Sequence, residues 1–531
     1  MNIKYKKIIF FVIFLILLIF LKIDFRFSNS IFCCSDDFDY YMHAETISED
    51  FDLNYENQLK GLEDTRYNSN SKVAPIGYIG TGILSAPFMF IGNLIESLIG
   101  NFFESSDLMN YKLLIYSFSP IFYLFAGCGL IFKTLNLLNI RYKNIELLLI
   151  FLGSGVSYYA FERFSMTHSY ETFATSLTLY WSAAYYSGKK TNLATWFIPL
   201  SVLIGLTIKW TNYYVLLIPP IVKLLSKSEN RLITEKKFIT STVSSICLFL
   251  GLSYQVYGVI TIDPRVSYQV QNSIVDLANT NLTQNFVLAY IDRIFTIFVS
   301  FEFGILYFMP VLAATILFSS FVFLKNIVKH RKIDYLHLTY LLSCFQLIFI
   351  VAMWRSTASS YGFRYLMGIY PLAILLYYHI RREYNIVYFH KIILTLSFFS
   401  ILSVLFFETT PETQLSLERI FNSFGKFTKY TQPTYLTGFL GSFFVFESYL
   451  KIFTTSFFGA LIFKILLMLL GRVNLTNLLE SLGLPVGNED FNIYINNLET
   501  IGFNKFLVTI IFIGCITIFL YRLLNNKNYQ T

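Results

Sequence analysis

Charged side chains are scarce in this sequence of 531 residues. Asp, Glu, Lys and Arg make up 14%, against 55% hydrophobic and 19% aromatic residues. A soluble domain of this length needs far more charge on its surface, so a soluble fold is excluded. The apolar residues form long blocks, such as Ile8–Leu21, Leu113–Phe132 and Phe506–Leu520. Because about 20 apolar residues cross a bilayer as a helix, these blocks predict an all-α, polytopic membrane protein with about 11–13 transmembrane helices.

Several common motifs are also absent. The six cysteines include the neighbours Cys33 and Cys34, which rarely bond to each other, and they indicate neither a disulfide framework nor a metal site. No glycine-rich phosphate loop follows a strand, and no alternating pattern indicates a lipid-facing barrel. Since no repeat or Gly/Ser linker separates a soluble domain, we divide the chain into a membrane domain, residues 1–470, and a polar segment with a last helix, residues 471–531.

The few charges are unevenly distributed. The segment Phe27–Tyr78 has ten Asp/Glu and three Lys/Arg, which gives it a net charge of −7. Because the whole chain has a net charge of +8, the residues outside this segment carry +15. Short basic loops recur at Lys133–Lys143, Lys189–Lys190, Lys223–Lys237, Lys325–Lys332 and Arg381–Arg382. Since basic loops stay in the cytoplasm, they place Phe27–Tyr78 outside as a long first loop after a retained signal-anchor helix. The positive charge therefore does not indicate nucleic-acid binding.

The apolar block Gly80–Leu98 conflicts with this orientation. If it crosses the membrane fully, the basic loop Lys133–Lys143 falls on the outer side. Either the block is re-entrant or interfacial, or the charge rule fails at this point. The sequence leaves both alternatives open.

An acidic cluster opens the first outer loop. Asp36, Asp37 and Asp39 repel one another near a low-dielectric boundary, which makes it costly to ionise all three. Such a cluster suits a bound cation or a general base, although a solvated loop is the plainer alternative. The amphipathic stretch Met42–Leu62 that follows fits short surface helices, and an ordered loop favours a functional site.

The cluster resembles a known family. Asp36-Asp37-Phe38-Asp39-Tyr40, directly after an N-terminal span, is similar to the Asp-Glu-x-x-Tyr opening of the GT-C superfamily of membrane glycosyltransferases, which includes protein O-mannosyltransferases and lipid A aminoarabinose transferases. Further similar segments are Asp50–Asn57, Ala74–Gly77, Met166–Tyr170 and Tyr361–Leu366, so the resemblance covers roughly residues 1–380. The chain departs from the family at Asp37, where Glu is usual, and in the additional acid Asp39. It also shows no large soluble C-terminal domain.

The resemblance implies a GT-C-like fold and an inverting sugar transfer from a polyprenyl-phosphate carrier to a hydroxyl on the extracytoplasmic face. The acceptor, whether lipid, glycan or protein, stays open, as does the sugar. Asp36 is expected to be the catalytic base, with Asp37 and Asp39 as further catalytic groups that orient the acceptor or hold a divalent ion such as Mg²⁺ or Mn²⁺. The expected location is a bacterial-type cytoplasmic (inner) membrane.

Three cationic or titratable residues are candidates for substrate contacts. Arg364 is expected to bind the donor phosphate, because Arg near a span end is costly and pairs with phosphate through two hydrogen bonds. Lys209 is the second phosphate ligand, and His168 contacts acceptor or phosphate. In the plainer alternatives Arg364 is an interfacial anchor and the other two are structural. Arg163 and Arg355 are weaker candidates.

Two other functional classes remain open. A polysaccharide polymerase or ligase also uses lipid-linked glycans, but its large outer loop generally lies in the middle or late chain. A transporter of lipid-linked glycans without chemistry favours inverted repeats and charges in mid-span. Here the charges cluster near the predicted outer ends of spans.

Overall fold

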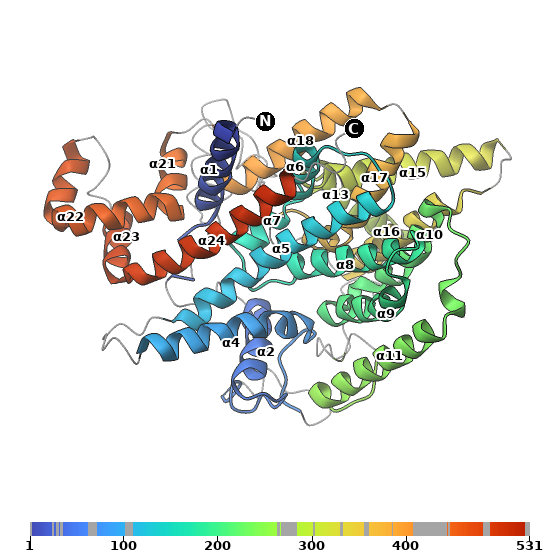
Figure 1. Ribbon diagram of the computed structural model, residues 1–531, viewed down its shortest axis with the longest axis horizontal. Helices are drawn as coiled ribbons and strands as arrows, with labels where there is room; N and C mark the ends of the chain where they lie inside the picture. Colours follow the sequence, from blue (N-terminus) through green and yellow to red (C-terminus); the bar gives the residue numbers. More distant parts are fainter. Residues whose placement is uncertain are drawn as a thin grey trace.

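The protein is built from helices that span most of the chain (Figure 1). The computed structural model describes residues 3–23, 26–27, 31, 35–61, 72–100, 110–262, 266, 284–300, 303–329, 333–354, 361–384, 386–406, 443, 446–481 and 489–525. Every regular element within these ranges is a helix, which confirms the predicted all-α class.

The helices have the following bounds. They are α1 (Ile3–Phe20), α2 (Ser35–Glu49), α4 (Gly80–Gly100), α5 (Tyr111–Leu137), α6 (Asn144–Leu152), α7 (Val156–Phe161), α8 (His168–Tyr186), α9 (Thr191–Ile208), η1 (Trp210–Leu217), α10 (Ile218–Ser226), η2 (Leu232–Thr234), α11 (Lys236–Tyr257), α13 (Gln284–Val299), α14 (Ile305–Phe308), α15 (Pro310–Val328), α16 (Tyr335–Trp354), η3 (Arg364–Ile369), α17 (Tyr370–Glu383), α18 (Val387–Phe406), α21 (Phe446–Thr455), α22 (Phe457–Ser481), α23 (Glu489–Thr500) and α24 (Phe503–Leu524).

Nine helices in the described ranges are long and apolar enough to cross a membrane, namely α4, α5, α9, α11, α15, α16, α18, α22 and α24. Helix α1 adds a shorter apolar stretch, Lys7–Phe20. The protein is therefore an integral, multi-pass membrane protein. Helix α8 is as long as a span but rich in Ser, Thr and Tyr. It contacts α5, α9, α10 and α17, and most of its side chains are buried, so its polar residues need not face lipid (Figure 1).

Helix α4 runs beside α2. A Cβ atom on Gly82 would lie 2.3 Å from Cβ of His43, and Asn93 Nδ2 lies 3.5 Å from Glu49 Oε1. The stretch from Gly82 to Asn93 therefore stays next to the acidic loop, although its length and composition also suit a membrane span.

Helix α5 also begins beside the acidic helix α2. Lys112 Nζ donates to Glu45 Oε1 at 2.5 Å and to Glu49 Oε1 at 2.7 Å. The 27 residues of α5 then extend about 40 Å, and they end within the basic segment Lys133–Lys143. The acidic helix α2 and the basic segment thus lie at opposite ends of one span-length helix. This arrangement favours the interfacial or re-entrant alternative for Gly80–Leu98.

Three interruptions of helices bring polar residues to the end of the bundle where α2 lies. A loop from Glu162 to Thr167 separates α7 from α8, and α9 ends at Lys209, whose backbone is extended. The short 3-10 helix η3 precedes α17, which has Pro371 in its first turn. Proline favours a helix start because its amide nitrogen has no hydrogen to leave unbonded.

Candidate functional site

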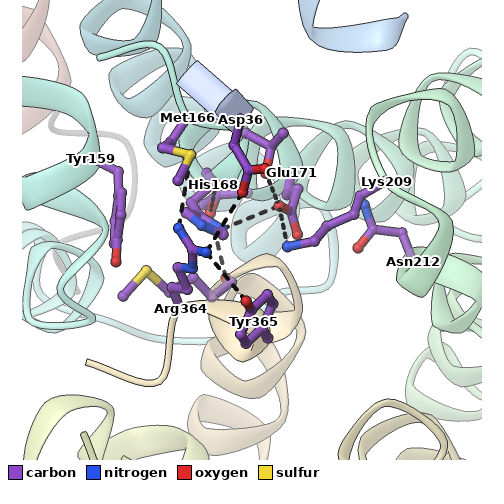
Figure 2. Close-up of polar contacts among 12 residues, drawn as sticks. Asp36, Tyr159, Met166, His168, Glu171, Lys209, Asn212, Arg364 and Tyr365 are labelled. Carbon is purple, nitrogen blue, oxygen red and sulfur yellow. Dashed lines mark hydrogen bonds and ion pairs between the residues drawn. The ribbon is translucent and has the colours of Figure 1, made fainter. Parts of the chain in front are cut away.

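Four residues predicted from separate segments lie together in the folded chain (Figure 2). Asp36 is in the first turn of α2, His168 is the first residue of α8, Lys209 caps the end of α9, and Arg364 is the first residue of η3. The residues are up to 328 positions apart in the sequence. Their gathering is a result of the tertiary fold, and it is the reason for treating this region as the candidate site.

Arg364 is buried and only loosely held. It is 5% exposed, and its Nη2 donates to the hydroxyl of Tyr365 at 3.2 Å. Nη1 has a weak contact of 3.9 Å with Sδ of Met166, and Nε has no hydrogen-bond partner among the described residues. The nearest carboxylate contact is Oδ2 of Asp36, at 3.7 Å from Nη2. Nε thus remains available to a ligand, and the contacts of Nη1 and Nη2 are long enough to be exchanged for stronger ones.

Asp36 is the accessible acid of the cluster. Its side chain is 42% exposed, whereas Asp37 and Asp39 are fully buried. A carboxylate at the open edge of a buried cationic site can meet a substrate hydroxyl from one side while Arg364 holds an anion from the other. Asp36 is thus the one of the three acids that a molecule outside the protein can reach.

Asp37 is held by a second arginine. Oδ2 of Asp37 accepts from Nη2 and Nε of Arg163, at 2.8 and 3.0 Å, and the Asp37 carbonyl accepts from Oγ of Ser165 at 2.5 Å. Burial nevertheless outweighs the attraction of Arg163 and raises the pKa of Asp37 to about 6. These contacts fasten α2 to the loop before α8. In this position Asp37 helps to fix the helix that carries Asp36.

The two predicted metal ligands, Asp37 and Asp39, are not placed to share one ion. Asp37 and Asp39 are two residues apart on α2, so their side chains leave the helix about 200° apart. The Asp37 carboxylate is also paired with Arg163. Within the described ranges, no three His, Cys, Asp or Glu side chains gather in a way that could hold a metal. The described residues therefore lend no support to a divalent ion at these two acids.

Lys209 and His168 share an acid that the sequence analysis did not single out. Oε1 of Glu171 lies 3.3 Å from Nζ of Lys209 and 3.2 Å from Nδ1 of His168 (Figure 2). Lys209 Nζ also lies 4.8 Å from the centre of the Tyr365 ring, over which Arg364 stacks at 5.1 Å. Both cations therefore border the same aromatic ring.

Buried polar atoms without a hydrogen-bond partner in the described structure gather around these cations. They are Nε of Arg364 and Nδ1 of His168, together with Oε2 of Glu171, Oγ of Ser169, Oγ1 of Thr211 and Oδ1 of Asn212. Buried polar groups normally find a partner in the protein or in bound molecules. Unpaired groups of this kind are typical of a site that binds a polar ligand, and Nε of Arg364 is the one among them that suits an anion.

An apolar cavity of about 300 Å³ is lined in part by residues of η1. It lies between α9, η1, α10 and α11, and its lining is almost entirely apolar, with Leu206, Tyr213 and Phe249 among its residues. Tyr213 directly follows Asn212, whose Nδ2 donates to the carbonyl of Gly205 at 3.0 Å. The charged site and the apolar cavity thus adjoin the same short helix.

Sequence reasoning missed Glu171, and it did not predict that Arg163 pairs with Asp37. The available signal for Glu171 was its position three residues after His168 inside a span-length helix, where an ionisable residue is costly and normally functional. Arg355, the other weak candidate, lies outside the described residues. The comparisons add nothing to this site: no family model, curated protein or solved structure matches the chain.

Proposed function

We propose that the protein is a membrane glycosyltransferase that moves a sugar from a polyprenyl-phosphate carrier to an acceptor hydroxyl on the extracytoplasmic face of a bacterial-type inner membrane. The observation that carries the proposal is the pairing of one accessible carboxylate, Asp36, with two buried cations that have spare binding capacity, Arg364 and Lys209. The transfer requires a carboxylate that can take the proton of the acceptor hydroxyl and positive charge that can bind the leaving phosphate.

The reaction proceeds by displacement at C1 of the sugar. The acceptor oxygen forms a bond to C1 as the bond between C1 and the phosphate oxygen breaks, so polyprenyl phosphate leaves with the bonding electrons. Asp36 takes the acceptor proton, a form of help that is typically worth about 10²–10⁴-fold. Arg364 and Lys209 stabilise the negative charge that develops on the leaving phosphate.

The cavity beside η1 supports a donor with an apolar tail. Its lining offers no charged group, and it adjoins the helix that follows Lys209. A phosphate bound at Lys209 and Arg364 would place an attached isoprenoid chain near this cavity. No step of the proposed mechanism requires a metal ion.

The test is the substitution Asp36→Asn in purified protein, with release of polyprenyl phosphate measured from a panel of polyprenyl-phosphate sugars and acceptors. Asn keeps the shape but does not take a proton at neutral pH, so we expect turnover to fall by about 10²-fold or more, while binding of polyprenyl phosphate persists. Glu56→Gln, which removes an exposed acid from the same loop, is the matched control and should leave turnover unchanged.

Two results would contradict the proposal. Near-normal turnover in the Asp36→Asn protein would remove Asp36 as the base. Uptake of lipid-linked glycan into vesicles without any release of polyprenyl phosphate would identify a transporter instead.

A further inference from the structure

Glu171 is a buried acid at the centre of the charged site. It is 1% exposed, and a single oxygen, Oε1, makes its three polar contacts. These contacts are to Nζ of Lys209, to Nδ1 of His168 and to the hydroxyl of Thr167. The other oxygen packs against Gly368, where an added Cβ atom would lie 2.9 Å away. The carboxylate is therefore fixed in place by its surroundings.

Lys209 depends on this acid for its position. Its ammonium group is at the end of a flexible stem, and the polar contact that fixes it is the one to Glu171, at 3.3 Å. The Tyr365 ring, 4.8 Å away, adds attraction but little direction. Without the negative charge of Glu171, a buried ammonium would have to turn toward water or lose its proton.

His168 depends on it as well. Nδ1 of His168 lies 3.2 Å from Oε1 of Glu171 without the geometry of a hydrogen bond, so the carboxylate holds the ring through a close polar contact. Tyr159 packs edge-on against the ring at 4.5 Å, which limits its rotation. One carboxylate thus sets the orientation of two of the four predicted site residues.

We propose that Glu171 is the positioning residue of the donor site: it holds Lys209 and His168 in the geometry that binds a lipid-linked phosphate, and it does not itself touch the substrate. This inference rests on the proposed function and concerns the phosphate end of the donor. Glu171 differs from Asp36 in that it is buried and has three partners, so it stays with Lys209 when the phosphate binds.

The experiment measures binding of polyprenyl phosphate and turnover in Glu171→Gln protein. Gln keeps the size of Glu but removes the charge. We expect the Kd for polyprenyl phosphate to rise about 10- to 100-fold, as for loss of one charge-assisted hydrogen bond, and kcat to fall as well, because a displaced Lys209 stabilises less of the charge on the leaving phosphate. Lys209→Met should raise Kd similarly, and the double variant should bind no better than Lys209→Met alone, because Glu171→Gln also removes the acid that holds His168.

The double variant separates a positioning role from a merely structural one. If Glu171 only neutralises a buried charge, Lys209→Met combined with Glu171→Gln removes both charges, and polyprenyl phosphate binding should return to the wild-type value. That recovery would refute the proposal. Unchanged Kd in the single Glu171→Gln variant would refute it too.

Glu146→Gln is the matched control for folding. Glu146 pairs with Nη1 of Arg381 at 3.2 Å and with Nε2 of His390 at 3.0 Å, so it is also an acid shared by a cation and a histidine. It lies in α6 and has no contact with the site. Its substitution should lower the melting temperature without changing Kd. Wild-type protein that fails to bind polyprenyl phosphate would instead defeat the proposed function, which keeps the two failures distinguishable.

Discussion

The two arginines of the site provide the sharpest test of how it works. Arg163 makes two short hydrogen bonds to the buried Asp37, whereas Arg364 has one hydrogen bond to a neutral hydroxyl and a contact of 3.7 Å to the half-exposed Asp36. Both side chains are largely buried. We therefore predict that alanine at the first position costs stability, and that alanine at the second costs ligand binding.

The magnitudes follow from these contacts. Removal of one partner from a buried ion pair costs about 3–5 kcal/mol, so Arg163→Ala should lower the melting temperature markedly. The long contact between Arg364 and a partly exposed acid is worth about 1 kcal/mol or less, so Arg364→Ala should melt close to wild type. If the guanidinium makes two charge-assisted hydrogen bonds to phosphate, its loss should weaken binding by about 2–4 kcal/mol. That range corresponds to about 30- to 1,000-fold in Kd.

The assay is thermal unfolding in detergent, with and without polyprenyl phosphate. Wild type and Arg163→Ala should both be stabilised by the ligand, whereas Arg364→Ala should show no shift at concentrations that saturate wild type. Arg364→Lys keeps the charge but loses the two parallel donors, so it should recover only part of the binding. A ligand shift of wild-type size in Arg364→Ala would refute the assignment. A melting temperature as low as that of Arg163→Ala would show that Arg364 is structural.

Three further predictions can be checked separately. Because the folded pKa of Asp37, about 6, exceeds the unfolded value of 3.8, the folded state binds the extra proton, and this group's contribution to stability declines as pH rises from 4 to 6. The loss of stability in Arg163→Ala, measured by thermal unfolding, should therefore be smaller at pH 5 than at pH 7.5; an equal loss would contradict this. Leu206→Trp should narrow the apolar cavity and raise the Kd of a long-chain polyprenyl phosphate more than that of a short-chain one. Equal effects on the two Kd values would show that the cavity does not bind the isoprenoid chain of the donor. With the native cysteines replaced, Cys at Asn54, an exposed position of the first loop, should react with an impermeant thiol reagent in intact cells and Cys at Ser228 should not; the reverse pattern would invert the orientation.

The candidate site was partly predictable because charged and polar residues are easy to identify in a mostly apolar sequence. Asp36, Arg364, Lys209 and His168 are polar residues beside long apolar blocks, where such residues are costly and few. Their partners were not predictable in the same way. The contacts of Arg163 with Asp37, and of Glu171 with Lys209, join residues 126 and 38 positions apart, and no local periodicity encodes such pairs.

The composition alone determined that this is a helical membrane protein, because in lipid every backbone polar group must be bonded internally and long apolar runs satisfy that only as helices. The distribution of charge along the chain also predicts that the acidic loop and the basic loops lie on opposite sides of the membrane. Only the tertiary structure decided which of the three neighbouring acids is accessible. Adjacent residues on a helix point about 100° apart, so Asp36 faces the site edge while Asp37 turns to Arg163. The packing of α2 against the loop before α8 set that direction. Contacts between segments distant in sequence depend on the folded chain, so a local sequence pattern does not predict them.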